Sequence, residues 1–399
     1  MEKYFPSRAF AGRRVHLGVS GSVAAYKALD LLRALQKCGL RVSVGITGSA
    51  AKFVTPLSFR SLGAETVYSS MFPADGIAEL GESYDPFGPL TPGAEAEAFI
   101  VLPASATTMA RVASGLADEI LSAQALAFPG RILFAPAMNP RMWSNPATKA
   151  NCARLRELGH VILEPVSGKV ACNEEGQGKL VDLRQAYLAV LKQLSPQDYA
   201  GKKVMITMGP TREQWDGVRF WSNLSTGTMG AAYAVAAYLR GAEVHAVCGP
   251  GCPWLPPEVN RIDVSPARDM YQAVMDIWPQ MDYGIFSAAV ADFYPEAHGT
   301  DKFKKDKATE GLSISFLPNP DILSAAGAAK GASQRIVGMA AETGNLEDNV
   351  RGKLKRKNAD MLVGNLVGVA DSGFASPLNR VFIADRNGRE ESWDVRPKS

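Results

Sequence analysis

The sequence predicts an α/β protein made of two Rossmann-like units with mainly parallel sheets. The main observation is an internal echo: residues 14–47 read as strand, Gly/Ser loop, helix, glycine and strand, and residues 203–249 follow the same order. Right-handed crossovers between such strands favour a parallel sheet. The second observation is the length, since 399 residues suffice for two or three ordinary domains.

Short apolar runs that end in small or polar residues give the individual elements. In the first half we expect strands at residues 15–19, 42–47, 99–102, 131–135 and 161–163, and a helix at 24–37. In the second half we expect strands at 204–207, 244–247, 283–287, 336–339, 361–363 and 381–384, and an Ala-rich helix at 231–240. A polar stretch at 194–202 is the expected linker, which gives domains 1–193 and 194–399.

Composition excludes several classes of protein. A net charge of +3 is too small to suggest a nucleic-acid partner. No apolar run reaches the roughly 18 residues needed to span a bilayer, and residues 1–14 lack a signal-peptide core, so we expect a cytoplasmic protein without membrane contact. Five cysteines give no disulfide framework. Cys248 and Cys252 flank Gly-Pro-Gly, which predicts a turn with two free thiols rather than a metal site.

A long polar loop, residues 209–230, separates the first strand and helix of the second half. Strand, Gly/Ser/Thr loop and helix is the geometry that presents backbone N–H groups and a helix N-terminus to an anion. The loop also carries Arg212, Arg219 and Asn223, which suit a phosphate or an acyl-phosphate oxygen. The alternative is a surface insertion without a binding role.

In the first half, four loops follow predicted strands, at residues 18–26, 47–51, 103–108 and 135–139. Ligands bind at the carboxyl ends of the strands of an open parallel sheet, so these loops should converge. The first three offer hydroxyls and N–H groups without fixed charge. That chemistry suits a cofactor monophosphate and a polar ring.

Together with Lys-Phe-Val-Thr-Pro-Leu at 52–57 and the Gly-rich loop 167–179, these loops resemble the flavin-dependent phosphopantothenoylcysteine decarboxylases over residues 14–182. The resemblance implies a flavodoxin-like flavoprotein domain that binds FMN. The implied FMN contacts are Ser20, Gly21, Ser22, Thr47, Ser105, Ala106 and Thr107. It also places Asn139 on the substrate carboxylate and makes Cys172 the acid that protonates the reduced intermediate. Without the resemblance, Cys172 reads equally well as a free loop thiol.

One family feature is missing. The family has a catalytic histidine some fourteen residues before its Pro-Ala-Thr-Ala loop, and that position here is Pro89. The four histidines, His16, His160, His245 and His298, lie elsewhere. Three readings stay open: the decarboxylase is impaired, another group serves, or the register shifts within residues 81–92.

The second half resembles the CTP-dependent phosphopantothenate–cysteine ligases over residues 202–385. The markers are Gly-Pro-Thr-Arg-Glu at 209–213, Ser-Asn at 222–223, Ala-Ala-Val-Ala-Asp-Phe at 288–293, Asp-Lys-Phe-Lys-Lys at 301–305, Asn-Pro-Asp-Ile-Leu at 319–323, Gly-Met-Ala-Ala-Glu-Thr at 338–343, a basic helix at 353–360, and Asn365, Gly373 and Asn379.

This resemblance implies that CTP activates the carboxylate of 4′-phosphopantothenate as an acyl-cytidylate, which cysteine then attacks. Lys302, Lys353 and Lys357 would hold the triphosphate, Asp292 would contact the nucleotide or Mg²⁺, and Asn223 would hold the acyl-cytidylate. Pro320, Asp321, Ile322, Leu323 and Met339 would line the nucleotide pocket, and Arg212 and Arg219 would contact substrate. Composition alone would make the run 351–357 a solvated basic helix face.

Both halves together resemble the bifunctional coenzyme A biosynthesis enzymes, which condense the substrates and then decarboxylate the product to 4′-phosphopantetheine. Two alternatives remain. One is a ligase whose flavin-binding half is only a scaffold, and the other is a flavoprotein module that regulates a partner. The resemblance also implies a homo-oligomer of trimeric flavodomains and dimeric ligase domains, which would combine into a dodecamer.

Overall fold

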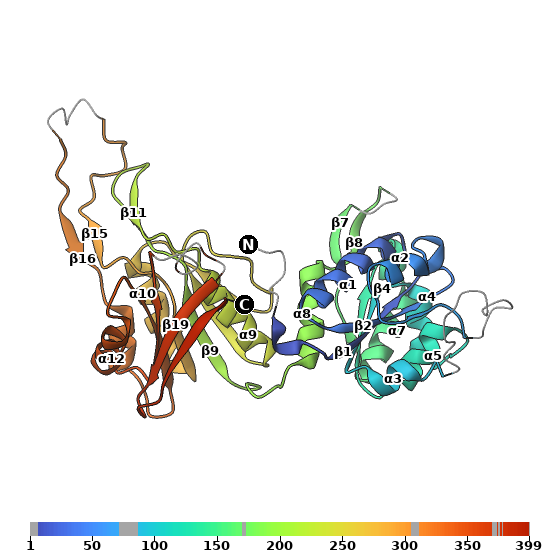
Figure 1. Cartoon of the computed structure of the whole chain (residues 1–399). Coiled ribbons are helices and arrows are strands. Elements are labelled where there is room, and N and C mark those ends of the chain that lie inside the picture. The colour runs from blue at the N-terminus through green and yellow to red at the C-terminus, as the bar shows by residue number, and fades with distance from the viewer. Residues whose placement is uncertain are drawn as a thin grey trace. The chain divides into compact units, whose positions relative to one another are not determined.

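A computed structural model describes residues 7–71, 87–169, 173–304, 311–368, 373, 376 and 378–398. The chain divides after Ser195 into two compact units, which we call the flavoprotein unit and the ligase unit (Figure 1). In the described residues no helix is both long enough and apolar enough to cross a membrane.

The flavoprotein unit is built on a six-stranded parallel sheet in the order β3-β2-β1-β4-β5-β6. The strands are β1 Arg14–Val19, β2 Arg41–Ile46, β3 Val67–Tyr68, β4 Ala98–Ala104, β5 Ile132–Pro136 and β6 Val161–Ile162. The helices are α1 Lys27–Lys37, α2 Pro56–Ser61, α3 Thr91–Glu95, α4 Ala106–Ala113, α5 Ile120–Ala127, α6 Pro140–Ser144, α7 Pro146–Glu157 and α8 Leu183–Leu194. Helices α1 and α8 pack together, and α4, α5 and α7 share a core with β4 and β5. A separate antiparallel hairpin joins β7 Val166–Lys169 to β8 Glu175–Lys179.

The ligase unit has an eight-stranded sheet in the order β13-β12-β9-β14-β17-β18-β19-β20. Its strands are β9 Lys203–Met208, β12 Glu243–Cys248, β13 Asn260–Asp263, β14 Tyr283–Phe286, β17 Arg335–Glu342, β18 Met361–Leu366, β19 Leu378–Asp385 and β20 Glu390–Pro397. The pairs β18–β19 and β19–β20 are antiparallel, and the other neighbours in this sheet are parallel. The helices are α9 Thr228–Leu239, α10 Ala267–Ile277, α11 Ile322–Ala328 and α12 Leu346–Arg356. Helices α10, α11 and α12 share one core around Trp278.

Two short ribbons complete the ligase unit. Strands β10 Arg212–Gln214 and β11 Phe220–Ser222 form one, and β15 Phe293–Pro295 and β16 Phe316–Pro318 form the other. Both ribbons extend away from the main sheet (Figure 1).

The predicted pair of Rossmann-like parallel sheets is confirmed. The strands that sequence analysis missed are β3, β13, β20 and those of the hairpin β7–β8 and of the two ribbons. Helices α2 to α8, α10 and α11 were not predicted either. Strand β20 shows why, because all eight of its residues are exposed and it contains no apolar run. The loop 209–230 was predicted to be continuous, and that is wrong, since β10 and β11 fold part of it into a hairpin.

Candidate active sites

The ligase unit contains a cavity of about 700 Å³ at the carboxyl ends of β9, β14 and β17. Strands β9 and β14 are neighbours, and β12 and β17 continue the sheet in opposite directions from them. This is the point where the strand order reverses, and ligands of open α/β sheets bind at such a point. The cavity therefore lies where the fold predicts a binding site.

One wall of the cavity is the N-terminus of α9. Its N-cap residue Gly227 has a φ of +71°, and Ser225, Thr226 and Thr228 beside it also line the cavity. Gly230 packs so closely on β9 that a Cβ there would lie 2.4 Å from the Cβ of Met208. A helix N-terminus with adjacent hydroxyls favours an anion. The predicted anion site is thus the last third of the loop.

Two asparagine side chains hold the loop that follows β14. Asn223 Nδ2 donates to the carbonyl oxygens of Ala289 (3.0 Å) and Val290 (3.2 Å). Asn319 Nδ2 donates to the carbonyl oxygen of Ala291 at 2.9 Å. Asp292, the next residue, also lines the cavity. These bonds fix the backbone from which the Asp292 carboxylate projects.

Helix α12 brings cations to the cavity. Lys353, Arg356 and Lys357 all line it, and Lys353 and Lys357 are four residues apart, hence on one helix face. Lys353 Nζ lies 2.7 Å from Glu342 Oε1, and Lys357 forms an ion pair with Asp321. Each lysine therefore has a carboxylate partner, and a phosphate must replace or share that partner.

Asp321 has a second role, because its side chain accepts a hydrogen bond from the Ser324 N–H at 2.9 Å and so caps α11. Burial favours the neutral acid, but the hydrogen bonds from Lys357 and Ser324 outweigh it and lower the pKa of Asp321. The apolar part of the wall comes from Pro320, Ile322, Leu323 and Met339. Met339 Sδ accepts a hydrogen bond from the Tyr233 hydroxyl at 3.5 Å.

Three sequence-predicted residues lie outside this cavity. The guanidinium of Arg219 binds Asp216, whose side chain is 0% exposed, and the N–H groups of Val218, Arg219 and Phe303 also donate to that carboxylate. Burial opposes ionisation, but these four donors lower the pKa of Asp216 to about 2. Arg219, predicted to contact substrate, thus neutralises a buried carboxylate outside this cavity.

Arg212 stacks on the Phe220 ring, 4.6 Å from its centroid, and lines a neighbouring cavity that shares Asn223, Ser225 and Thr226 with the main one. Lys302 is exposed and does not line the main cavity. Arg212 begins β10 of one ribbon, and Lys302 lies in the connection between β15 and β16 of the other. The sequence motifs place these two residues in the loops, but they do not predict in which direction the ribbons orient them.

Sequence analysis gave no site role to two cations of the cavity wall, Arg356 and Lys398. Lys398 lines the cavity, and its Nζ donates to the carbonyl oxygen of Gly373 at 2.6 Å. Burial lowers the pKa of Lys398. The penultimate lysine belongs to no motif, and only the pairing of β20 with β19 brings it to this edge. Asn365, Gly373 and Asn379, which the motif comparison did single out, line the same cavity.

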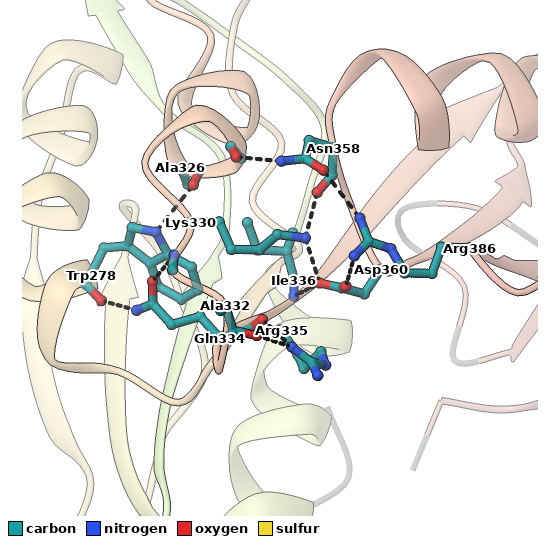
Figure 2. Close-up of polar contacts among 12 residues, drawn as sticks. Trp278, Ala326, Lys330, Ala332, Gln334, Arg335, Ile336, Asn358, Asp360 and Arg386 are labelled. Carbon is teal, nitrogen blue, oxygen red and sulfur yellow. Dashed lines mark hydrogen bonds and ion pairs between the residues drawn. The ribbon is translucent and has the colours of Figure 1, made fainter.

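A polar network fixes the helices that carry these groups (Figure 2). Lys330 Nζ lies 2.9 Å from Asp360 Oδ2, and the Ile336 N–H donates to the same oxygen at 2.7 Å. Asn358 Nδ2 donates to the Gly327 carbonyl oxygen of α11 at 2.8 Å, and Asn358 Oδ1 accepts from Arg386. A Cβ at Gly327 would lie 2.1 Å from the Lys357 carbonyl oxygen. The backbone of Lys357 is thus locked against α11.

In the flavoprotein unit, hydroxyl groups tie the predicted flavin-binding loops together. Ser20 Oγ donates to the Pro103 carbonyl oxygen at 2.8 Å and accepts from the Ser105 N–H at 2.7 Å. Ser22 Oγ donates to the Ala137 carbonyl oxygen at 3.1 Å, and Thr47 Oγ1 caps the next turn. A Cβ at Gly21 would lie 2.6 Å from Ser49 Cβ. The structure therefore brings Ser20, Gly21, Ser22, Thr47 and Ser105 to one edge of the sheet. Ala106 and Thr107 begin α4 at that edge.

The hairpin β7–β8 packs on the loop that carries Asn139. The Met138 N–H donates to the Gly178 carbonyl oxygen at 3.0 Å, and a Cβ at Gly178 would lie 2.4 Å from the Met138 carbonyl oxygen. Asn139 Nδ2 donates to Glu174 Oε2 at 3.0 Å, and its Oδ1 caps α6. Cys172, which follows β7 in the chain, lies outside the described residues. Strands β7 and β8, which flank Cys172 in the sequence, form a hairpin that lies beside Asn139.

All four histidines fall in the described residues, and none lies at the carboxyl edge of the flavoprotein sheet. His16 is in the first half of β1, fully buried, with Nδ1 2.8 Å from Ser43 Oγ and Nε2 3.0 Å from Gln124 Oε1. Burial lowers its pKa to about 4, against a smaller opposing effect of the Gln124 hydrogen bond. His160 precedes β6, and His245 and His298 belong to the ligase unit. The family histidine has no substitute histidine in this chain.

Within the described residues, no group of three or more His, Cys, Asp or Glu side chains is arranged to hold a metal ion.

Two sequence profiles divide the chain. The profile described as Flavoprotein matches residues 5–195, and that of the DNA/pantothenate metabolism flavoprotein C-terminal domain matches residues 199–399. The fold and these matches define the class: a flavoprotein unit joined to a pantothenate-metabolism unit.

Relatives match along the whole chain. The coenzyme A biosynthesis bifunctional protein CoaBC of Escherichia coli (strain K12) is 38% identical over 95% of this chain and 92% of its own length. The CoaBC proteins of Vibrio parahaemolyticus and Bacillus subtilis are each 36% identical, over 94% and 97% of this chain and 92% and 94% of their own. The chain belongs to the family of bifunctional coenzyme A biosynthesis proteins. It is an enzyme with phosphopantothenate–cysteine ligase and phosphopantothenoylcysteine decarboxylase activities.

Solved structures match one half at a time. The C-terminal domain of a CoaBC protein is 35% identical over 50% of this chain and 89% of its own, with a TM-score of 0.41. The FMN-dependent cysteine decarboxylase SpaF is 28% identical over 47% of this chain and 100% of its own, with a TM-score of 0.39.

Proposed function

We propose that the ligase unit uses CTP to activate the carboxylate of 4′-phosphopantothenate as an acyl-cytidylate, which the amine of cysteine then attacks with release of CMP. The observation that carries this is one cavity lined by a helix N-terminus, three cationic side chains of α12 and an apolar wall. Such a site binds a polyanion at one end and a flat base at the other. Catalysis of this kind rests on positioning and charge stabilisation.

Each residue of the cavity has a role that follows from the chemistry of its side chain. Lys353 and Lys357 hold the triphosphate after exchanging their carboxylate partners for phosphate oxygens. Asp292 binds Mg²⁺ together with phosphate oxygens, and the ion supplies charge neutralisation. Asn223 holds the acyl-cytidylate. The apolar wall from Pro320 to Leu323, with Met339, receives the cytosine and ribose.

We propose less direct roles for Lys302, Arg212 and Arg219, because these residues do not line the main cavity. Arg212 borders the neighbouring cavity beside Asn223, where it contacts 4′-phosphopantothenate. Lys302 requires either a movement of the segment around Phe303 or a second chain to reach the nucleotide, and Arg219 requires the same to reach the substrate. A homo-oligomer with dimeric ligase units and trimeric flavoprotein units, and from them a dodecamer, is part of the same proposal.

For the decarboxylase we propose FMN at the edge formed by Ser20, Ser22, Thr47 and Ser105. The fit rests on two features: the hydroxyls at this edge carry no fixed charge, and Gly21 lies too close to Ser49 for a side chain, so the two strand-end loops meet closely there. Bound FMN supplies a reversible two-electron acceptor. Asn139 orients the carboxylate of 4′-phosphopantothenoylcysteine, and Cys172 gives a proton to the product while the hairpin excludes water.

The missing histidine keeps a second candidate function in view, namely a ligase with an impaired flavin-binding scaffold. The two functions differ in one measurable product. With purified protein and 4′-phosphopantothenoylcysteine, release of CO₂ supports the bifunctional enzyme, and its absence with FMN bound supports the scaffold.

The nucleotide assignment is tested with Lys357→Met and the matched control Lys355→Met. Lys355 is on the same helix, but it does not line the cavity. We expect K357M to raise the KM for CTP by roughly tenfold to a hundredfold, since a charged hydrogen bond contributes about 1.5–3 kcal/mol. K355M should behave as wild type. Equal effects of the two variants would reject the assignment, and faster turnover with ATP would reject CTP.

A further inference from the structure

Two thiols meet at the end of β12, behind the ligase cavity. Cys248 ends β12 and is the register partner of Met208 on β9. The chain then reverses over residues 249–251, where Gly251 has a φ of +77°. Cys252 Sγ returns to within 3.3 Å of the Met208 carbonyl oxygen, to which the Gly249 N–H also donates at 2.9 Å. The turn therefore folds Cys252 back onto Cys248.

The two thiols are unequal, and Cys248 Sγ donates to the Ala246 carbonyl oxygen at 3.5 Å. The interaction between the thiols raises the pKa of Cys248 and lowers that of Cys252, and burial raises the pKa of both. Cys248 is fully buried and Cys252 is partly exposed. The other charged groups that face the pair are Arg261 and Asp263, which bind each other at 2.8 Å. Cys252 is thus the accessible nucleophile of the pair.

The sulfur of Cys252 also touches the substrate loop. A Cβ at Gly209 would lie 2.3 Å from Cys252 Sγ, and a Cβ at Gly227 would lie 3.0 Å from it. Gly227 caps α9 and lines the cavity. A displacement of Cys252 therefore changes the support behind the predicted anion site.

We propose that Cys248 and Cys252 form a reversible disulfide, and that its formation lowers ligase activity. The second half of this inference rests on the proposed ligase cavity; the first does not. The Cys252 thiolate attacks a small-molecule disulfide RSSR, which gives a mixed disulfide and RS⁻. Cys248 loses its proton and attacks the Cys252 sulfur, which releases the second RS⁻. The balance is one RSSR reduced to two RSH and one protein dithiol oxidised.

The coupling follows from geometry. A covalent S–S bond of about 2.05 Å is shorter than any contact between two thiols, so Cys252 must move toward Cys248 and away from its glycine neighbours. We expect kcat/KM for the nucleotide to fall by roughly tenfold, because a shift of about 1 Å at a positioned site costs up to a hundredfold. Dithiothreitol should restore the activity.

The first experiment incubates the full chain with oxidised glutathione, blocks remaining thiols by alkylation, and maps the peptides by mass spectrometry. We expect a Cys248–Cys252 crosslink that has lost two hydrogen atoms. Cys248→Ser should stop at glutathione on Cys252, and Cys252→Ser should leave Cys248 unmodified. Cys152→Ser, which removes another buried thiol, should still form the crosslink. Absence of the crosslink in folded wild type, or equal glutathionylation of C252S at Cys248, would overturn the disulfide.

The second experiment measures ligase turnover on the same samples. Wild type should lose activity on oxidation, whereas C252S, which cannot form the crosslink, should keep its own initial rate. A crosslinked protein with full ligase activity would overturn the coupling while leaving the disulfide. A reduced protein without ligase activity would instead contradict the proposed function, so the two failures are distinguishable.

Discussion

At the residue scale, the charged groups are neutralised before any substrate arrives. Lys353 and Lys357 pair with Glu342 and Asp321, and Arg219 pairs with Asp216. Removing one member of a buried pair leaves the other uncompensated, which is costly. Asp216 is 0% exposed, whereas the side chains of Glu342 and Asp321 are 13% and 50% exposed. Taking Arg219 from its carboxylate is therefore costlier than taking Lys353 or Lys357 from theirs.

The buried His16 predicts a pH dependence of the flavoprotein unit. Its pKa is lowered to about 4 in the folded state, so between roughly pH 6.5 and 4 the unfolded chain binds the extra proton. Stability is therefore lost as the pH falls through this window, by on the order of 3 kcal/mol for a 2.5-unit difference. His16→Asn keeps a hydrogen-bonding group near Ser43 but does not titrate. The protection of β1 amides against hydrogen exchange, taken relative to the intrinsic rate at each pH, should decrease less steeply with falling pH in H16N than in wild type. Parallel profiles of the two proteins would contradict the role of His16.

At the element scale, one close contact in each unit holds a segment beside the residues of the proposed site. The hairpin β7–β8 is held to the Asn139 loop by the close approach of Gly178 to Met138. Helices α11 and α12 are held by Asn358, which has a φ of +49° and bonds to Gly327. The hydrophobic periodicity of the sequence predicts neither of these contacts.

Gly178→Ala should impair the decarboxylase alone. The new Cβ would lie 2.4 Å from a backbone oxygen, so the hairpin must shift relative to Asn139. We expect decarboxylation of added 4′-phosphopantothenoylcysteine to fall by roughly tenfold to a hundredfold with unchanged ligase turnover. Gly168→Ala is the matched control, because its φ of +151° is similar to the +159° of Gly178 but its nearest neighbour is 3.6 Å away. If both variants lose the same activity, backbone strain and not the contact is responsible.

Asn358→Gly keeps the left-handed backbone and removes the side-chain bonds to Gly327 and Arg386. We expect the ligase unit to lose on the order of 1–2 kcal/mol of unfolding free energy and the KM for CTP to rise, since Lys357 is the preceding residue. Asn345, with a φ of +48° but no side-chain cap, provides the control. Denaturant unfolding and CTP titrations of N358G and N345G compare the two, and an unchanged KM in N358G would show that Lys357 is positioned without Asn358.

At the scale of the whole molecule, sequence predicted the two mainly parallel sheets and part of the lining of the ligase cavity. Apolar runs identify buried parallel strands whose end loops converge, and the resemblance to the ligases assigned Asn223, Asp292 and Met339 to one site. Lys398 could not, because its place depends on the antiparallel return of β20. The exclusion of Arg219 depends on the buried Asp216, and no spacing rule shows which arginine a buried carboxylate takes. Cys172 stays a prediction.

The most direct test of a working bifunctional enzyme follows products by mass over time. The purified chain is mixed with 4′-phosphopantothenate, cysteine, CTP, Mg²⁺ and FMN, with Cys172→Ser in parallel. The account predicts that wild type makes 4′-phosphopantetheine and that C172S accumulates 4′-phosphopantothenoylcysteine. Accumulation of 4′-phosphopantothenoylcysteine by wild type would contradict it and show a ligase joined to a silent flavoprotein unit.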